Sequence, residues 1–350
     1  MKNKSVPFPE RHVANCIECG LCVRECSFLQ EYGSPRAIAS SWRPDSKAGQ
    51  QLPFACNLCG LCTAVCPPKV GLDPRAMFLA MRQQVVANGV APFPEHKRLI
   101  AYEKRGTSSL FSCFALPERC DTVLFPGCAF AGTRPARLLE LFEHLRQDIP
   151  TLGMVLGCCT KPSHDLGRSD FFHSRFGELR QALMAQGVRR VLVLCPSCHA
   201  VFKQYGSPLH TEYVYSVLAE QPLPEQDTHH RIGKAGLENI TVQDPCTTRQ
   251  DPQVHLAVRK LLKAAGLKME DMPHHGGRRC AVGRAGQCPL SVRTLPNTGV
   301  ICVERRWKNR SLCLLRSPIV QAVWISSRPG CRSCICSTCS LPQKLRLKEE

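Results

Sequence analysis

Three short apolar runs rich in β-branched and aliphatic residues lie in the middle of the chain. They span 122–128, 153–159 and 190–195, and each ends at one or more cysteines. Short apolar runs bounded by turns are typical of buried strands. The chain between Cys128 and Cys158 is 29 residues long and that between Cys159 and Cys195 is 35, which leaves room for a crossover helix in a β-α-β unit. The pattern therefore predicts an open α/β sheet, and the ends of its strands face one crevice.

Helical periodicity fills the intervening segments. Apolar residues recur at helical spacing over 133–145 and over 171–186, and Gly187 is a suitable C-cap. Two helices are also predicted near the N-terminus, at 35–40 and at 73–86, the second with Asp73 as N-cap and Pro74 in the first turn. Strands and helices alternate only after residue 120, so the chain is predicted to hold a helical module followed by α/β units.

Five cysteines follow the three predicted strands, and we call them the five-thiol site: Cys128, Cys158, Cys159, Cys195 and Cys198. The chain opens Met-Lys-Asn-Lys-Ser-Val-Pro without an apolar export segment, which predicts a reducing cytoplasmic compartment. Clustered thiols there indicate metal or redox chemistry, with an iron-sulfur cluster first and zinc second, and disulfides are a third alternative. The neighbouring His164 and His199 are predicted to be solvated loop residues, and Cys113 and Cys120 plain thiols.

This spacing resembles the cysteine-rich CCG domain of heterodisulfide reductase catalytic subunits. Related iron-sulfur subunits of glycolate, lactate and anaerobic glycerol-3-phosphate oxidation carry the same domain. The resemblance implies that all five cysteines hold a noncubane 4Fe-4S cluster and form the catalytic centre. One position departs from the pattern, because the glycine expected after the cysteine pair is Thr160.

Two matching Cys-x2-Cys-x2-Cys-x3-Cys runs occupy residues 16–26 and 56–66. They resemble the two-cluster ferredoxins, in which the fourth cysteine of each run crosses to the other cluster. The resemblance implies two 4Fe-4S cubane clusters. Site I would be Cys16, Cys19, Cys22 and Cys66, and site II would be Cys56, Cys59, Cys62 and Cys26. The long spacer between the runs resembles the α-helical ferredoxins of heterodisulfide reductase and succinate dehydrogenase type. A zinc ribbon is the alternative for these runs.

A second copy of the strand-turn-cysteine pattern begins after residue 226. Residues 240–246 end at Cys246, a further predicted metal ligand, and a helix follows from Pro252 to Ala265 and ends at Gly266. The cysteine pair of this second CCG repeat is then due, but Cys280 stands alone. The second cluster is therefore predicted to be lost.

The chain is predicted to run out of frame from about Cys280, a frameshift that the genetic code itself indicates. Reading the last base of each codon with the first two of the next turns the sequence after Cys280 into the missing C-C-G signature. The same shift converts 318–326 into Y-C-A-G-C-V-D-F, which restores a Cys-x-x-Cys pair, and turns the end of the chain into an apolar helix. On this interpretation the seven cysteines after Cys280 are accidental and the tail is poorly packed.

The predicted fold class is α+β and multidomain. The expected parts are a ferredoxin-type domain at 1–100, a linker at 101–119, a first CCG domain at 120–225, the start of a second at 226–280 and an out-of-frame tail at 281–350. The net charge of +18 suggests a polyanion partner, but half of it lies in the suspect tail. Aromatic residues show no stacking pattern beside the basic ones. A zinc-binding nucleic-acid protein is therefore the third choice of function.

The leading prediction is an oxidoreductase subunit similar to heterodisulfide reductase, in which ferredoxin-type clusters pass electrons to a noncubane cluster that reduces a disulfide. The alternative is an electron-transfer subunit of a flavin-dependent glycolate, lactate or glycerol-3-phosphate dehydrogenase. The sequence has no Rossmann or P-loop motif, so a flavoprotein or a membrane cytochrome is expected as the redox partner. The expected location is the cytoplasm, where such a partner could hold the protein at the inner membrane.

Overall fold

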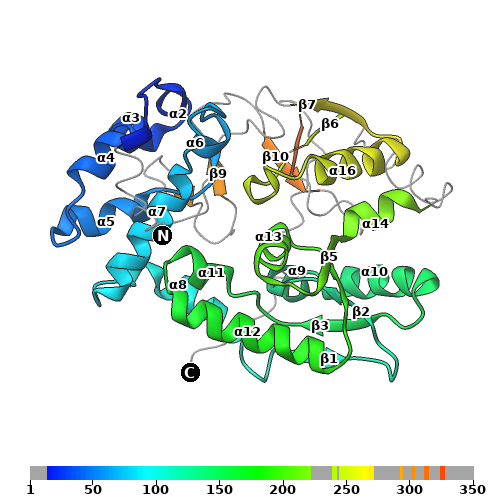
Figure 1. Ribbon diagram of the computed structural model, residues 1–350. Coiled ribbons are helices and arrows are strands. Elements are labelled where there is room, and N and C mark those ends of the chain that lie inside the picture. The colour runs from blue at the N-terminus through cyan, green and yellow to red at the C-terminus, as the bar shows by residue number, and fades with distance from the viewer. Residues whose placement is uncertain are drawn as a thin grey trace, which may run out of the picture.

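The computed structural model describes residues 14–221, 239–242 and 244–271, and four short strands beyond them. A helical part at the N-terminus lies beside an α/β part built on a central sheet (Figure 1). The four further strands form two antiparallel pairs, and their bounds are β8 Val292–Thr294, β9 Ile301–Val303, β10 Ser311–Leu314 and β11 Trp324–Ser327. The α+β fold class predicted from the sequence is confirmed.

The described residues of the N-terminal part form the helices α2 Leu21–Arg24, α3 Ser27–Tyr32, α4 Pro35–Ser41, α5 Lys47–Ala55, α6 Leu61–Ala64 and α7 Pro74–Ala87. Helix α7 begins as its sequence predicts, since the Asp73 carboxylate accepts the Ala76 N–H at 3.1 Å and Pro74 fills the first position. The buried side chains of α7 pack against those of α3 and α4. The core of Phe28, Leu29, Ile38, Met77, Phe78 and Met81 also includes Cys56 and Cys62 of the second cysteine run, and Cys22 and Cys26 of the first run pack against it.

The sheet has five strands in the order β1-β3-β2-β4-β5. Strands β2 to β5 are parallel and β1 is an antiparallel edge. Their bounds are β1 Cys113–Ala115, β2 Thr122–Phe125, β3 Gly153–Leu156, β4 Arg190–Val193 and β5 His210–Tyr213. The three predicted strands are confirmed as β2, β3 and β4. Because β3 and β4 flank β2, the cysteines that follow these three strands leave the sheet at the same edge.

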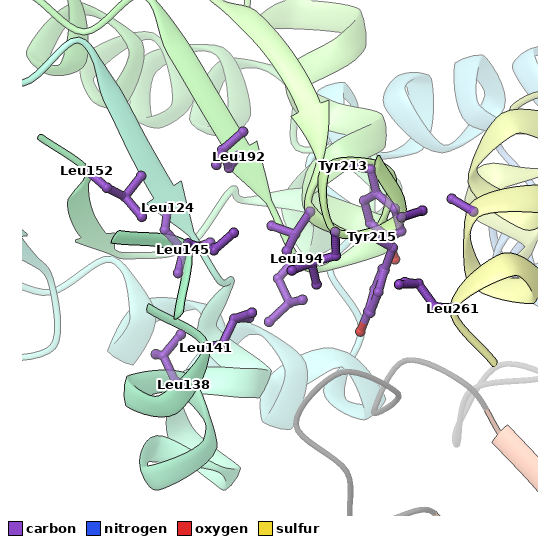
Figure 2. Close-up of a cluster of buried hydrophobic side chains, with 14 of the residues drawn as sticks. Leu124, Leu138, Leu141, Leu145, Leu152, Leu192, Leu194, Tyr213, Tyr215 and Leu261 are labelled. Carbon is purple, nitrogen blue, oxygen red and sulfur yellow. The ribbon is translucent and has the colours of Figure 1, made fainter. Parts of the chain in front are cut away.

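Helices cover both faces of the sheet: α9 Cys128–Thr133, α10 Pro135–Asp148, α11 Lys161–Asp165, α12 Ser169–Ala185, α13 Pro196–Tyr205 and α14 Val214–Glu220. Alternate residues of β2 serve the two faces. Leu124 belongs to the buried cluster that includes side chains of α10 and α14 (Figure 2), whereas Val123 belongs to the cluster that includes side chains of α12 and α13. This doubly covered arrangement leaves the strand ends as the place for a site.

A second β-α-β unit follows, with β6 Asn239–Val242 paired in parallel to β7 Lys268–Asp271. Helix α16 (Pro252–Ala264) connects them and ends before Gly266, whose φ is 76°. Leu261 of α16 joins the buried cluster of the first unit beside Tyr215 (Figure 2). The predicted strand and helix at 240–265 are thus present, whereas Cys280 and the cysteines after it lie outside the described residues.

The segment predicted to be a linker contains regular structure. Helix α8 (Lys97–Gly106) follows the short 3-10 helix η1 (Pro94–His96), and β1 comes after it. Glu103 of α8 is fully buried and accepts the backbone N–H of Ser163 at 2.9 Å, so α8 is fixed on α11 of the CCG region. In the described part of the chain, every helix is too short or too polar to cross a lipid bilayer.

Candidate iron-sulfur site

The two cysteine runs adopt the same backbone conformation. Glu18 and Leu58 have φ of 52° and 50°, and Gly20 and Gly60, two positions later, have φ of 73° and 71°. These glycines precede α2 and α6, which carry the next cysteine of each run. A left-handed residue before each short helix turns the N–H groups of the loop inward, where thiolates or inorganic sulfides accept hydrogen bonds.

The four cysteines predicted for site I lie close together. Its four cysteines, Cys16, Cys19, Cys22 and Cys66, line one cavity together with Cys62 of the neighbouring site. Burial and the nearby Cys16 thiolate raise the pKa of Cys22 to about 11, and Cys19 and Cys66 contribute in the same direction. Four thiols that oppose one another's ionisation need a positive group between them, and ferric and ferrous iron supply that charge.

Site II lies deeper in the same module. Cys56 and Cys62 are buried, and burial raises the pKa of Cys56 to about 12 against the opposing effect of Arg82. The Leu58 N–H donates to Cys56 Sγ at 3.4 Å. Burial also raises the pKa of Cys62, with Cys56, Cys59 and Cys26 adding to it. The thiols of the predicted set are therefore close enough to one another to interact.

The five-thiol site comes together from the ends of β2, β3 and β4. A hydrogen bond with Cys158 holds the pKa of Cys128 below its ordinary value and raises that of Cys158. Cys198 makes the same kind of bond with Cys159 and with Cys195. All five sulfurs thus form one connected group, whose members come from segments up to 70 residues apart.

Two glycines allow these segments to approach. A Cβ on Gly127, whose φ is 78°, would lie 2.8 Å from Cys195 Cβ and 3.0 Å from Cys198 Sγ. A Cβ on Gly106, the last residue of α8, would lie 3.0 Å from Cys158 Cβ. The Tyr102 hydroxyl, one turn earlier in α8, donates to Cys128. Helix α8 therefore forms one wall of the five-thiol site.

Among the described residues, no group of three or more His, Cys, Asp and Glu side chains is arranged to hold a single metal ion. The fit to an iron-sulfur cluster rests on the donor sets, which are four thiols, four thiols and five thiols. At the five-thiol site it rests also on Gly106 and Gly127, whose missing side chains leave the backbone close to the cysteines. The residues present therefore suit 4Fe-4S groups.

His164 and His199 are buried, so the prediction of solvated loop histidines was wrong. His164 Nδ1 lies 2.9 Å from Asp165 Oδ1, and its Nε2 lies 3.0 Å from the hydroxyl of Tyr205, which is 41 residues away in sequence. His199 stacks edge-on with Tyr213. Both rings are packed by residues distant in sequence, which local polarity around a cysteine motif does not reveal.

Sequence reasoning missed Arg82, which joins the ferredoxin module to the CCG region. Its side chain is 1% exposed and donates to the carbonyls of Pro53, Cys56 and Asp165. Cys56 belongs to site II, and Asp165 ends α11, which follows the Cys158–Cys159 pair. The only signal in the sequence is an arginine on the apolar face of a helix.

Cys246, the predicted ligand from the second repeat, lies beside site II. Burial raises the pKa of Cys59, and the Cys246 thiol adds to the shift. Three residues on, Arg249 Nε donates to the Cys59 carbonyl at 3.1 Å. Cys113 is exposed on β1, and Cys120 is buried with its Sγ 3.3 Å from the Thr122 carbonyl.

Comparison with known families identifies two types of domain in the chain. Residues 15–71 match the 4Fe-4S dicluster domain and residues 122–203 match the cysteine-rich CCG domain. These ranges contain all the cysteines of sites I and II and of the five-thiol site. The chain therefore contains a 4Fe-4S dicluster domain followed by a cysteine-rich CCG domain.

The relatives are proteins of lactate use and electron transport. Lactate utilization protein B of Bacillus cytotoxicus is 35% identical over 99 residues, which are 24% of this chain and 20% of that protein. The uncharacterized electron transport protein YkgF of Escherichia coli is 31% identical over 104 residues, 26% of this chain and 22% of the relative. The chain thus spans about a fifth of these relatives. No solved structure matches it.

Proposed function

We propose that the chain is the iron-sulfur electron-transfer subunit of a flavin-dependent dehydrogenase for a 2-hydroxy acid of the lactate and glycolate class. The relatives named for lactate utilization support this substrate class over the disulfide substrate of the leading prediction from the sequence. The carrying observation is the Arg82 side chain, which donates to the carbonyl of Cys56 in site II and to that of Asp165 at the end of α11, the helix that follows the Cys158–Cys159 pair, and so joins the two cluster-binding regions.

The chemistry needs a partner that divides electron pairs. Oxidation of a 2-hydroxy acid to a 2-oxo acid releases two electrons and two protons, which a flavin in the partner subunit accepts together. Iron-sulfur clusters bound at the three sites would each accept one electron at a time. A membrane cytochrome is the proposed final acceptor, and the protons leave from the flavin.

The residues of this chain have three tasks in that scheme. The cysteines hold the clusters, and the loop N–H groups, such as that of Leu58 on Cys56, stabilise the negative charge on the thiolates. The apolar core around Met77 and Phe78 excludes water from site II. Site I lies nearer the surface, with Cys19 exposed, and is the proposed entry point for electrons from the flavoprotein.

A disulfide reductase is the second candidate, and the five-thiol site is the observation that favours it. A cubane needs four thiols, so the fifth is free to interact with a substrate sulfur. In that reaction the disulfide accepts two electrons from the reduced clusters and two protons from solvent, and releases two thiols.

Anaerobic purification of the full chain tests the cluster assignments. Cys59→Ser should lose one ferredoxin-type signal, and Cys159→Ser should lose the signal of the five-thiol cluster while both ferredoxin signals remain. Electron paramagnetic resonance with iron and sulfide analysis measures both effects. Unchanged iron content in Cys159→Ser, or zinc in place of iron in the wild type, would contradict the assignment.

Two further assays separate the candidate functions. Deleting the gene should abolish growth on lactate or glycolate as the carbon source and leave growth on glucose intact. The dithionite-reduced protein should release thiol neither from oxidised glutathione nor from a mixed disulfide of two different thiol coenzymes. Stoichiometric thiol release, combined with normal growth of the deletion strain on both acids, would favour the disulfide reductase instead.

A further inference from the structure

Thr160, the residue directly after the Cys158–Cys159 pair, combines two unfavourable features. Its φ of 53° and ψ of 23° place a β-branched residue in the left-handed region, a strained backbone conformation for such a side chain. Its side chain is 1% exposed, and its Oγ1 has no hydrogen-bond partner among the described residues. A buried hydroxyl without a partner destabilises the fold, because it has lost its hydrogen bonds to water and gained none in return.

The position of Thr160 relates both features to the five-thiol site. The Thr160 backbone N–H donates to Cys158 Sγ, so the residue lies against the sulfur group. Although Thr160 is the N-cap residue of α11, its hydroxyl makes no capping hydrogen bond. Threonine at an N-cap ordinarily stabilises its helix through that bond. The hydroxyl therefore does not serve the helix that its residue begins.

Other polar atoms near the site are accounted for. His199 Nδ1 also lacks a hydrogen bond, but it lies 3.8 Å from Asp251 Oδ2, within reach of an ion pair. The Tyr102 hydroxyl is engaged with Cys128. Thr160 is the remaining buried donor that follows a cysteine of the site and has no protein acceptor in the described part of the chain.

We propose that the Thr160 hydroxyl donates a hydrogen bond to a sulfur of the cluster held at the five-thiol site and thereby raises its reduction potential. The proposal rests on the proposed iron-sulfur function. Reduction adds negative charge to the cluster and its sulfurs, and a donor aimed at sulfur stabilises the reduced form more than the oxidised form. The hydroxyl that has no protein acceptor belongs to the residue directly after two of the five cysteines, where a bound cluster would offer sulfur acceptors.

Three variants of the full chain separate the hydroxyl from the shape of the side chain. Thr160→Val keeps the branched shape and removes the hydroxyl, Thr160→Ser keeps the hydroxyl, and Thr160→Gly removes both the hydroxyl and the left-handed strain. Each is purified anaerobically and titrated with a redox mediator set, with the five-thiol signal followed by electron paramagnetic resonance. Iron and sulfide content is measured in parallel.

The midpoint potential of the five-thiol cluster should be lower in Thr160→Val and Thr160→Gly than in the wild type, and unchanged in Thr160→Ser. The potentials of the clusters at sites I and II should not change in any variant. If Thr160→Val does not assemble the five-thiol cluster, the potential measured in Thr160→Gly tests the proposal, because glycine adopts the left-handed conformation without strain. The proposal would be overturned by an unchanged potential in cluster-loaded Thr160→Val or Thr160→Gly. It would also be overturned if Thr160→Ser showed the same lowered potential as these two variants. Absence of the five-thiol cluster from the wild type would overturn the proposed function first, and this inference with it.

Discussion

Replacing Arg82 with Met should lower the free energy of unfolding by about 3 kcal/mol. The guanidinium is 1% exposed and donates to three backbone carbonyls, at Pro53, Cys56 and Asp165. Leaving each carbonyl unpaired in the interior costs about 1–3 kcal/mol. Removing the buried charge returns several kcal/mol of desolvation energy, which offsets part of that loss. Met fills much of the same volume, so no large cavity adds to the effect.

The position of the three carbonyls makes the prediction specific. Two belong to the ferredoxin module and one to α11 of the CCG domain, so amide hydrogen exchange should accelerate in both α5 and α11. Helix α14, which Arg82 does not touch, should keep its protection. Arg24→Met is the matched control, because that side chain is 72% exposed and its ion pair is a surface contact worth little. Wild-type stability in Arg82→Met, or faster exchange in α5 alone, would refute the coupling role.

Three other predictions concern the remaining features. Gly127→Ala should lose the five-thiol cluster and keep both ferredoxin clusters, because its Cβ would lie 2.8 Å from Cys195 Cβ, whereas Gly132→Ala, with no atom within 4 Å, should be silent in the same spectra. Full cluster loading in Gly127→Ala would show that the close approach is not needed. Burial raises the pKa of Glu103, so the folded state holds its proton more tightly; this stabilisation is present below the ordinary pKa of 4.5 and is lost as pH rises through the folded value. Urea unfolding of Glu103→Gln between about pH 5 and 8 should therefore show a smaller decline with pH than the wild type, and equal slopes would count against the buried carboxylate. Resequencing the gene should reveal a single-base insertion or deletion near the codon of Cys280, and an intact frame there with a protease-resistant 281–350 segment would exclude it.

The features that the sequence predicts are those fixed by local spacing. The similar φ angles of Glu18 and Leu58 follow from the identical cysteine spacing of the two runs. The parallel strands follow from apolar runs that are separated by enough residues for a crossover. The contacts that join modules are different. Arg82 and Glu103 bond to partners 83 and 60 residues away, and either residue would be an ordinary charged side chain on a helix if it faced solvent. Only the packed structure distinguishes the buried charge from the exposed one.

The second repeat shows why motif order along a chain does not give the order of sites in space. Cys246 comes after the five-thiol cysteines in sequence, yet its thiol interacts with Cys59 of site II, and Arg249 donates to the carbonyl of the same residue. Helix α16 packs on α14 of the first CCG unit and thereby holds this segment over the ferredoxin module. A cluster completed by a restored reading frame would therefore stand beside site II. On the other side, Arg82 joins Cys56 of site II to the end of α11, the helix that follows the Cys158–Cys159 pair, so site II would lie between the two CCG units.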